Sequence, residues 1–297
     1  MLKAKPRYET KRHFSPLTVI LLIGLILYVI SLVYPLVWSL LTSFKSPAEY
    51  RINITGLPEE WIWNYSFVFE KFTVRVWTGK TMLNVGVWQM LLNSLLYSVG
   101  SAVCAAFIPC IAAYACAKFK YKTSKIFFNI VVVTMVLPVV GNLPSEIQMA
   151  RWFGLFDQVW GLWIMKCSAL GMYFLIFHAV FKSLPDDFTE AAKVDGAGNF
   201  RIFFRIVLPV VRNTLMTVIL IKFIEFWNDY QTPLVYLPTH PVMAYGMYQM
   251  QNTTTNGMNS VPMRMTGAMI MLIPIMIIFL LLQKRLLGNL MVGGIKG

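Results

Sequence analysis

Ionisable side chains inside an apolar stretch are the first residues in this sequence that could do chemistry. Lys222, Glu225 and Asp229 lie within the stretch Val211–Tyr230, at spacings of three and four residues. On a helix these spacings put all three side chains on one face, where the lysine can neutralise an acid. Because a charge inside a membrane is costly, such residues indicate either a structural ion pair or a site that binds a proton or a cation.

Other residue types that often catalyse or bind metals lack a productive spacing. Cys104, Cys110 and Cys116 recur every six residues, so on a helix they point about 120° apart and cannot converge on one metal. The three histidines are far apart, and none has a partner at a catalytic or metal-binding spacing. The tripeptide Gly-Lys-Thr at 79–81 resembles the end of a phosphate-binding loop but lacks that loop's first glycine. We therefore expect no catalytic residue, no metal site and no nucleotide site in this chain.

The composition indicates a membrane protein. The 297 residues are 57% hydrophobic and only 13% charged, about half of the charged fraction of a typical soluble domain. An ordinary soluble enzyme is therefore excluded. We predict an all-α, polytopic membrane protein with six transmembrane helices of roughly 20 residues, the length that crosses about 30 Å of hydrocarbon. The six apolar stretches are Leu17–Leu41, Val87–Ala117, Ile126–Gly141, Val159–Phe181, Val211–Tyr230 and Thr266–Leu282.

The distribution of basic residues predicts the orientation of these helices, because loops rich in Lys and Arg remain in the cytoplasm. Of the 26 Lys and Arg residues, 17 fall in the N-terminal arm, the second and fourth connections and the C-terminal tail, and seven fall in the other connections. Both termini are therefore expected in the cytoplasm. The predicted organisation is a cytoplasmic arm at 1–16, a transmembrane domain at 17–284 with an external connection at about 42–86, and a cytoplasmic tail at 285–297. The net charge of +13 then reflects topology, and no nucleic-acid partner is expected.

The fourth connection contains the signals of a short cytoplasmic helix between the fourth and fifth spans. Asp187 and Glu190 have the spacing of a capping box with Asp187 as the cap, and Gly196 or Gly198 can supply a left-handed stop. About two helical turns fit between these signals. A second helical stretch follows, with arginines on one face, and is expected to lie along the lipid headgroups until Pro209 breaks it.

The same connection carries a motif that resembles a known family. Glu-Ala-Ala at 190–192, Gly196, Ile206 and Leu-Pro at 208–209 match every spaced position of the EAA motif, which is typical of membrane subunits of bacterial ABC importers. Trp-Asn-Asp at 227–229 and the ending Gly-Gly-Ile-Lys-Gly at 293–297 fit the sugar-importing branch. The chain therefore resembles the permease subunits of ABC-type sugar importers, and the MalG-like half of the maltose-type permeases in particular, over nearly its whole length.

This resemblance implies a coupling function for the connection at about 183–211, whose short helix would dock in a cleft of a partner ATPase. The residues implied in ATPase coupling are Glu190, Ala191, Ala192, Asp195, Gly196, Ile206, Leu208 and Pro209, and the implied C-terminal ATPase contact is Gly293, Gly294 and Lys296. As an alternative, Glu190 could do no more than cap its own helix.

The resemblance also implies partners. The expected assembly contains a second, MalF-like permease subunit, two copies of a cytoplasmic ATPase that bind ATP and Mg²⁺, and an external solute-binding lipoprotein at the bacterial cell membrane. The expected substrate is a carbohydrate, and more specifically an oligosaccharide, which would cross the bilayer intact by alternating access. This chain itself would bind no cofactor and catalyse no reaction.

Three residues near the external end of the fifth stretch are expected to line the substrate pathway, because an indole ring offers a face on which sugar rings can stack. They are Trp227, Asn228 and Asp229. The alternative function is ion-coupled secondary transport through Lys222, Glu225 and Asp229, which would proceed without ATP.

Overall fold

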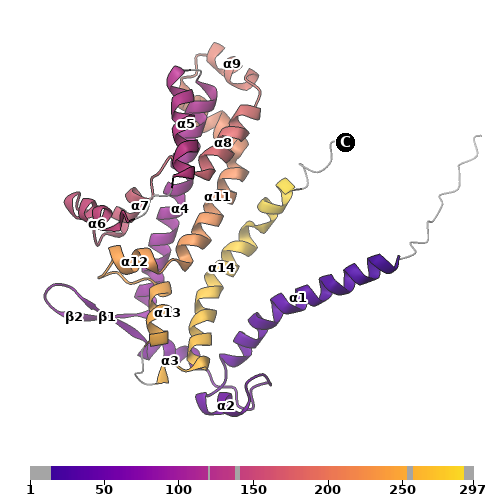
Figure 1. Cartoon of the computed structure of the whole chain (residues 1–297), viewed down its shortest axis with the longest axis vertical. Coiled ribbons are helices and arrows are strands. Elements are labelled where there is room, and N and C mark those ends of the chain that lie inside the picture. Colours follow the sequence, from indigo (N-terminus) through magenta and orange to yellow (C-terminus); the bar gives the residue numbers. More distant parts are fainter. Residues whose placement is uncertain (1–14, 120, 138–140, 253–256, 291–297) are drawn as a thin grey trace, which may run out of the picture.

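The computed structural model of the chain describes residues 15–119, 121–137, 141–252 and 257–290, and these residues form a mostly helical bundle (Figure 1). Among them, four segments are helical, long and apolar enough to cross a membrane. These are α1 (Pro16–Thr42), α4 (Val87–Lys118), the continuous segment Asn199–Asn228, which contains α10 and α11, and the part of α14 (Val261–Leu290) that ends at Leu281.

The third and fourth apolar stretches form shorter helices. The third is α5 (Lys122–Val136), which at 1.5 Å per residue is about 22 Å long, and it is followed by the separate helix α6 (Leu143–Trp152). The fourth is divided into α7 (Val159–Met165) and α8 (Met172–Ser183). The break ends at Gly171, whose φ of +121° is open to glycine and costly for other residues. The fourth predicted span is therefore two helices rather than one.

Helix α4 lies at the centre of the bundle and packs most extensively against α11 (Leu208–Asn228) and α8. Small side chains allow these helices to approach closely, as is typical of helix contacts in membranes. Ala102, Ala106, Cys110 and Ala113 follow one side of α4 and are completely buried. The same three helices extend to the end of the bundle where α9 (Asp187–Val194) lies (Figure 1).

A β-hairpin at the opposite end corrects the expectation of an all-α fold. Strand β1 (Thr73–Trp77) pairs antiparallel with β2 (Met82–Gly86). In β1 the side chains of Val74 and Val76 are buried and alternate with exposed ones, which is the period-two pattern of a strand with one covered face. The Gly-Lys-Thr tripeptide at 79–81 lies in the hairpin turn, where Gly79 has a φ of +83°.

The rest of the predicted external connection is held together by buried polar contacts. It contains α2 (Pro47–Ile52) and α3 (Asn64–Lys71). The carbonyl oxygen of Ser43 accepts hydrogen bonds from Asn64 Nδ2 (2.8 Å) and Thr266 Oγ1 (3.2 Å). The buried Lys45 Nζ donates to the carbonyl of Asn53 (2.7 Å). These bonds connect the end of α1 to the start of α14, next to α13 (Met243–Asn252).

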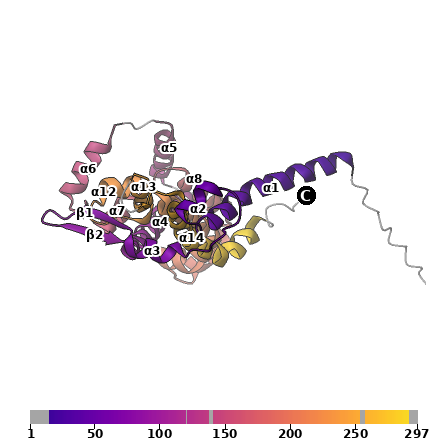
Figure 2. The same ribbon diagram turned by 90° about the horizontal axis from the view of Figure 1, so that it is seen from below.

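Helix α1 runs away from the bundle and meets it only near its C-terminal end, as both views show (Figures 1 and 2). None of the residues in its most apolar 18-residue window is buried within the chain. In water such a surface would be a large apolar patch. Its aliphatic side chains are therefore suited to contact lipid or another membrane protein.

Candidate functional site

Helix α9 is the short helix that the sequence predicts between the fourth and fifth apolar stretches. It ends in a Schellman motif, in which the N–H of Gly196 donates to the carbonyl of Lys193 (3.0 Å) and that of Ala197 donates to Ala192 (2.9 Å). Gly196 has a φ of +78°, so it supplies the left-handed stop. The expected cap is wrong by one residue, because Asp186 occupies the N-cap and Asp187 is the first residue of the helix.

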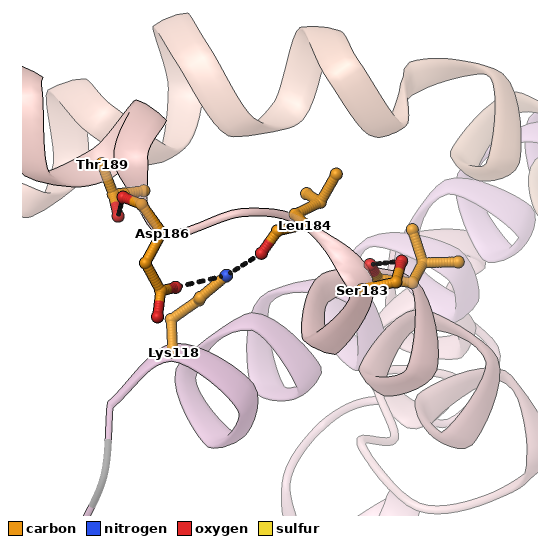
Figure 3. A network of polar contacts seen from close by, with 6 residues as sticks. Lys118, Ser183, Leu184, Asp186 and Thr189 are labelled. Carbon is orange, nitrogen blue, oxygen red and sulfur yellow. Dashed lines mark hydrogen bonds and ion pairs between the residues drawn. The ribbon is translucent and has the colours of Figure 1, made fainter.

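Asp186 is not a side-chain cap, because its carboxylate binds a lysine instead (Figure 3). Lys118 Nζ, at the C-terminal end of α4, donates to Asp186 Oδ1 and to the carbonyl of Leu184, both at 2.7 Å. The Lys118 side chain is only 10% exposed, whereas that of Asp186 is 53% exposed. Thr189 adds a hydrogen bond from its hydroxyl to the Asp186 carbonyl (2.7 Å). These contacts fasten the start of α9 to the end of the central helix.

The two faces of α9 differ in exposure. Thr189 and Ala192 face the bundle and are buried, whereas Glu190, Ala191 and Asp195 are exposed. A cavity of about 310 Å³ opens between α9 and the end of α4, and its lining includes Glu190, Lys193 and Lys118. Glu190 is therefore available for contact with another protein.

The segment that follows α9 is one continuous helix with a local change of winding. It begins as α10 (Asn199–Ile202), passes through a π turn (Phe203–Val207) and continues as α11. The expected break at Pro209 is absent, since the wider hydrogen-bonding pattern of the π turn accommodates a residue that has no N–H. Along this segment Ile206 and Leu208 are half-buried and Pro209 is exposed. The predicted C-terminal contact, Gly293, Gly294 and Lys296, lies outside the described residues.

The three ionisable side chains of the predicted stripe, Lys222, Glu225 and Asp229, form two separate polar pairs rather than one network. Lys222 Nζ lies 2.8 Å from Glu225 Oε2, which confirms that the lysine can neutralise an acid of the stripe. Asp229 instead accepts a hydrogen bond from Tyr97 Oη on α4 (2.9 Å). Its second carboxylate oxygen accepts the backbone N–H of Thr232 (3.0 Å).

The three predicted pathway residues lie in different surroundings. Trp227 is 2% exposed, and its indole N–H donates to the carbonyl of Met271 on α14 (3.1 Å). Its ring therefore packs inside the chain and offers no free face. Asn228 is exposed and donates to the carbonyl of Ile224 (2.8 Å), while Asp229 is half-buried.

Next to Asp229 lies a cavity of about 490 Å³ that no sequence pattern indicates, because its lining comes from α6, α7 and α12 (Gln231–Tyr236). Its polar lining includes Glu146, Lys166, Gln231 and Thr232. The hydroxyl of Tyr236 donates to Glu146 Oε2 (3.0 Å). Burial, with a smaller effect from Glu146, raises the pKa of Tyr236 to about 12, so the hydroxyl remains a donor at neutral pH.

The likeness of this architecture to a solved structure extends over nearly the whole chain. A chain of a bacterial ABC transporter involved in the import of the acidic polysaccharide alginate superposes with a TM-score of 0.73 and 22% identity. The match covers 94% of this chain and 99% of that one. At this identity the likeness shows that the two chains share a fold.

Relatives that match along most of their length are named as permease proteins of uptake or transport systems. The chain is 26% identical to the diacetylchitobiose uptake system permease protein of Streptomyces coelicolor, over 98% of this chain and 92% of that protein. It is 25% identical to the arabinooligosaccharides transport system permease protein of Bacillus subtilis over the whole of both. It is 29% identical to the sn-glycerol-3-phosphate transport system permease protein of Yersinia pestis, over 88% of this chain and 92% of that protein.

A family profile matches residues 105–290, which is more than half of the chain and includes α9, the π turn and α11. The profile describes the inner membrane components of binding-protein-dependent transport systems. This chain is therefore a multi-pass membrane protein that belongs to the family of binding-protein-dependent transport system inner membrane components.

Proposed function

We propose that this chain is one of the two permease subunits of an ATP-driven importer that moves an oligosaccharide across the bacterial cell membrane. Relatives similar along nearly their whole length are named for the uptake of diacetylchitobiose and arabinooligosaccharides. The structural observation that carries the proposal is the exposed helix α9, which is tied to the central helix α4 by Lys118. The chain is a non-catalytic subunit, and ATP and Mg²⁺ are bound by the partner ATPases.

In this proposal α9 is the coupling helix and its exposed face docks on one of two ATPase subunits. Glu190, Ala191 and Asp195 are exposed on α9. Ala192 and Gly196 fix the shape of the loop, and Ile206, Leu208 and Pro209 lie where it joins α11. Since α9 is attached both to α4 and to α11, a rigid-body movement of the ATPases would move both helices together. The C-terminal residues Gly293, Gly294 and Lys296 provide a second ATPase contact.

The proposed topology has six spans with both termini in the cytoplasm. The third span contains α5 and the fourth contains α7 and α8, and the α9 end of the bundle faces the cytoplasm. The uncovered surface of α1 supports a contact with a second, MalF-like permease. The β-hairpin end would then face the external solute-binding lipoprotein.

Within the proposed pathway, Asn228 and Asp229, at the end of α11, are the residues nearest to substrate. Trp227 serves to position them, because its indole is buried and bonded to α14. The ion-coupled alternative is not favoured, since Lys222 is paired with Glu225 and Asp229 accepts two hydrogen bonds.

The proposal is tested with the complete transporter in proteoliposomes. Labelled arabino- and chito-oligosaccharides would be supplied with the binding protein, and ATP would be enclosed with the ATPase. We expect intact sugar to accumulate with ATP in the absence of any ion gradient. Accumulation driven by a proton or sodium gradient without ATP would establish the ion-coupled alternative.

The same system tests the coupling role of α9. Glu190→Lys is expected to reduce ATPase co-purification and uptake roughly tenfold, as for a charged interface contact. The matched control is Glu60→Lys, which changes an exposed acid in the predicted external connection. Normal ATPase binding and uptake by Glu190→Lys would contradict the assignment.

A further inference from the structure

A further cavity lies at the α9 end of the bundle and adjoins the cavity beside α9, with which it shares Phe119 and Tyr121. Its volume is about 680 Å³, and it opens between the end of α4, the start of α5 and the end of α8. Phe119 and Phe128 form part of an apolar wall, and the ring of His178 lies 4.8 Å from that of Phe128.

The mouth of this cavity is strongly basic. Lys122, Lys125 and Lys182 line it, and the part of the lining that the structure describes contains no Asp or Glu. All three lysines are exposed. Lys122 and Lys125 belong to the first turn of α5, whose N-terminus has no side-chain cap, so the backbone N–H groups there add to the positive potential. The combined charge favours an anionic ligand.

The surface next to the cavity is apolar and follows α5 toward the middle of the bundle. Ile126, Ile130 and Val133 are spaced by four and three residues, which places them on one face of the helix. They are 60%, 47% and 54% exposed. A ligand that fits both features has an anionic head and an apolar tail.

We propose that this cavity binds the headgroup of an anionic phospholipid, with the phosphate at Lys122, Lys125 and Lys182 and an acyl chain along Ile126, Ile130 and Val133. Basic pockets between transmembrane helices near the cytoplasmic leaflet are suited to such headgroups. The proposed orientation of the chain decides only which leaflet supplies the lipid. Binding of the lipid at this cavity requires neither the transported substrate nor ATP.

The test is native mass spectrometry of the complete transporter, purified in detergent with equal amounts of phosphatidylglycerol and phosphatidylcholine. The wild-type complex should retain phosphatidylglycerol selectively, and less of it as salt is raised. Each Lys→Gln substitution should weaken retention about fivefold, so Lys122→Gln, Lys125→Gln and Lys182→Gln together should nearly abolish it. The triple Lys→Arg variant should keep it.

The matched control removes three basic charges from the opposite end, through Lys71→Gln, Arg75→Gln and Lys80→Gln, and should leave phosphatidylglycerol retention unchanged. Three results would overturn the proposal. The first is undiminished retention in the triple Gln variant. The second is complete displacement of the lipid by millimolar inorganic phosphate, which would show a phosphate site without a lipid tail. The third is loss of ATPase co-purification with normal lipid retention, which would assign these lysines to the ATPase contact.

Discussion

Lys118 and Asp186 are 68 positions apart in the sequence and form an ion pair of 2.7 Å between the end of α4 and the start of α9. The same ammonium group also binds the carbonyl of Leu184. One lysine thus connects the central helix to the proposed coupling helix through two separate acceptors. The carbonyl bond is the better shielded of the two, because the Asp186 carboxylate is largely exposed.

This arrangement predicts that Lys118→Met will impair coupling more than Asp186→Asn does. The lysine variant loses both contacts, whereas the aspartate variant keeps the bond to Leu184. An exposed ion pair contributes only about 0.2–1 kcal/mol, so the Asp186→Asn variant should retain most of its uptake. The measurement is the number of ATP molecules hydrolysed per sugar transported, which should rise in Lys118→Met. An equal effect of both variants would show that the ion pair alone carries the connection.

Gly196 and Gly198 provide a matched pair for testing the stop signal of α9. Apart from the adjoining residues of the chain, nothing lies within 4 Å of a Cβ added at either position, so any cost of substitution comes from the backbone conformation. Gly196 has a φ of +78°, whereas Gly198 has a φ of −70°. Gly196→Ala should therefore lose about 1 kcal/mol of local stability, and Gly198→Ala should lose little.

The readout for these two glycines is hydrogen exchange of the backbone amides in α9. Exchange should be faster in Gly196→Ala, and Gly196→Asn should be milder because asparagine tolerates the left-handed region. Equal protection in the Gly196→Ala and Gly198→Ala variants would contradict this reading.

The hydrogen bond between Tyr97 and Asp229 predicts that removing the tyrosine hydroxyl alone will lower the stability of the protein. Tyr97→Phe preserves the ring, which is completely buried, but removes the donor to Asp229. Hydrogen bonds between transmembrane helices are typically worth about 0.6–2 kcal/mol. The midpoint of thermal unfolding in detergent should fall by a few degrees. Tyr114→Phe on the same helix is the control and should shift the midpoint less.

The proposed orientation predicts opposite accessibility for two exposed residues. In a variant whose four native cysteines are replaced by alanine, a cysteine at Thr73 in β1 should react with a membrane-impermeant maleimide added to whole cells. A cysteine at Thr123 in the first turn of α5 should react only after the cells are opened. Both positions are exposed in the chain, so the membrane alone should decide the difference. The reverse pattern would overturn the orientation.

The local signals of the sequence predicted α9 well, because a helix of two turns is specified by its own ends. Acidic residues begin it and Gly196 stops it, and both features act within a few residues. The position of the cap was missed by one residue. The reason is that Asp186 binds Lys118, a partner in another helix that no local pattern identifies.

Contacts between distant segments could not be predicted from the sequence either, because no local pattern identifies a partner in another helix. The partner of Asp229 is Tyr97, 132 positions away, and helical spacing alone suggested Lys222. The indole of Trp227 was expected in the pathway, but its burial depends on how α14 packs against α11. The hairpin was missed because only β1 alternates between exposed and buried residues, over five residues, whereas β2 does not alternate.

The π turn at 203–207 sets an angle as well as accommodating Pro209. A π turn contains one residue more than the α-helical winding requires, and one residue of an α-helix corresponds to about 100° of rotation. If these five residues wound as a regular α-helix instead, the extra residue would swing α9 by about 100° around the axis of α11 and turn Glu190 away from its present direction. The π winding therefore fixes the direction in which the proposed docking face of α9 points relative to the helix that crosses the membrane.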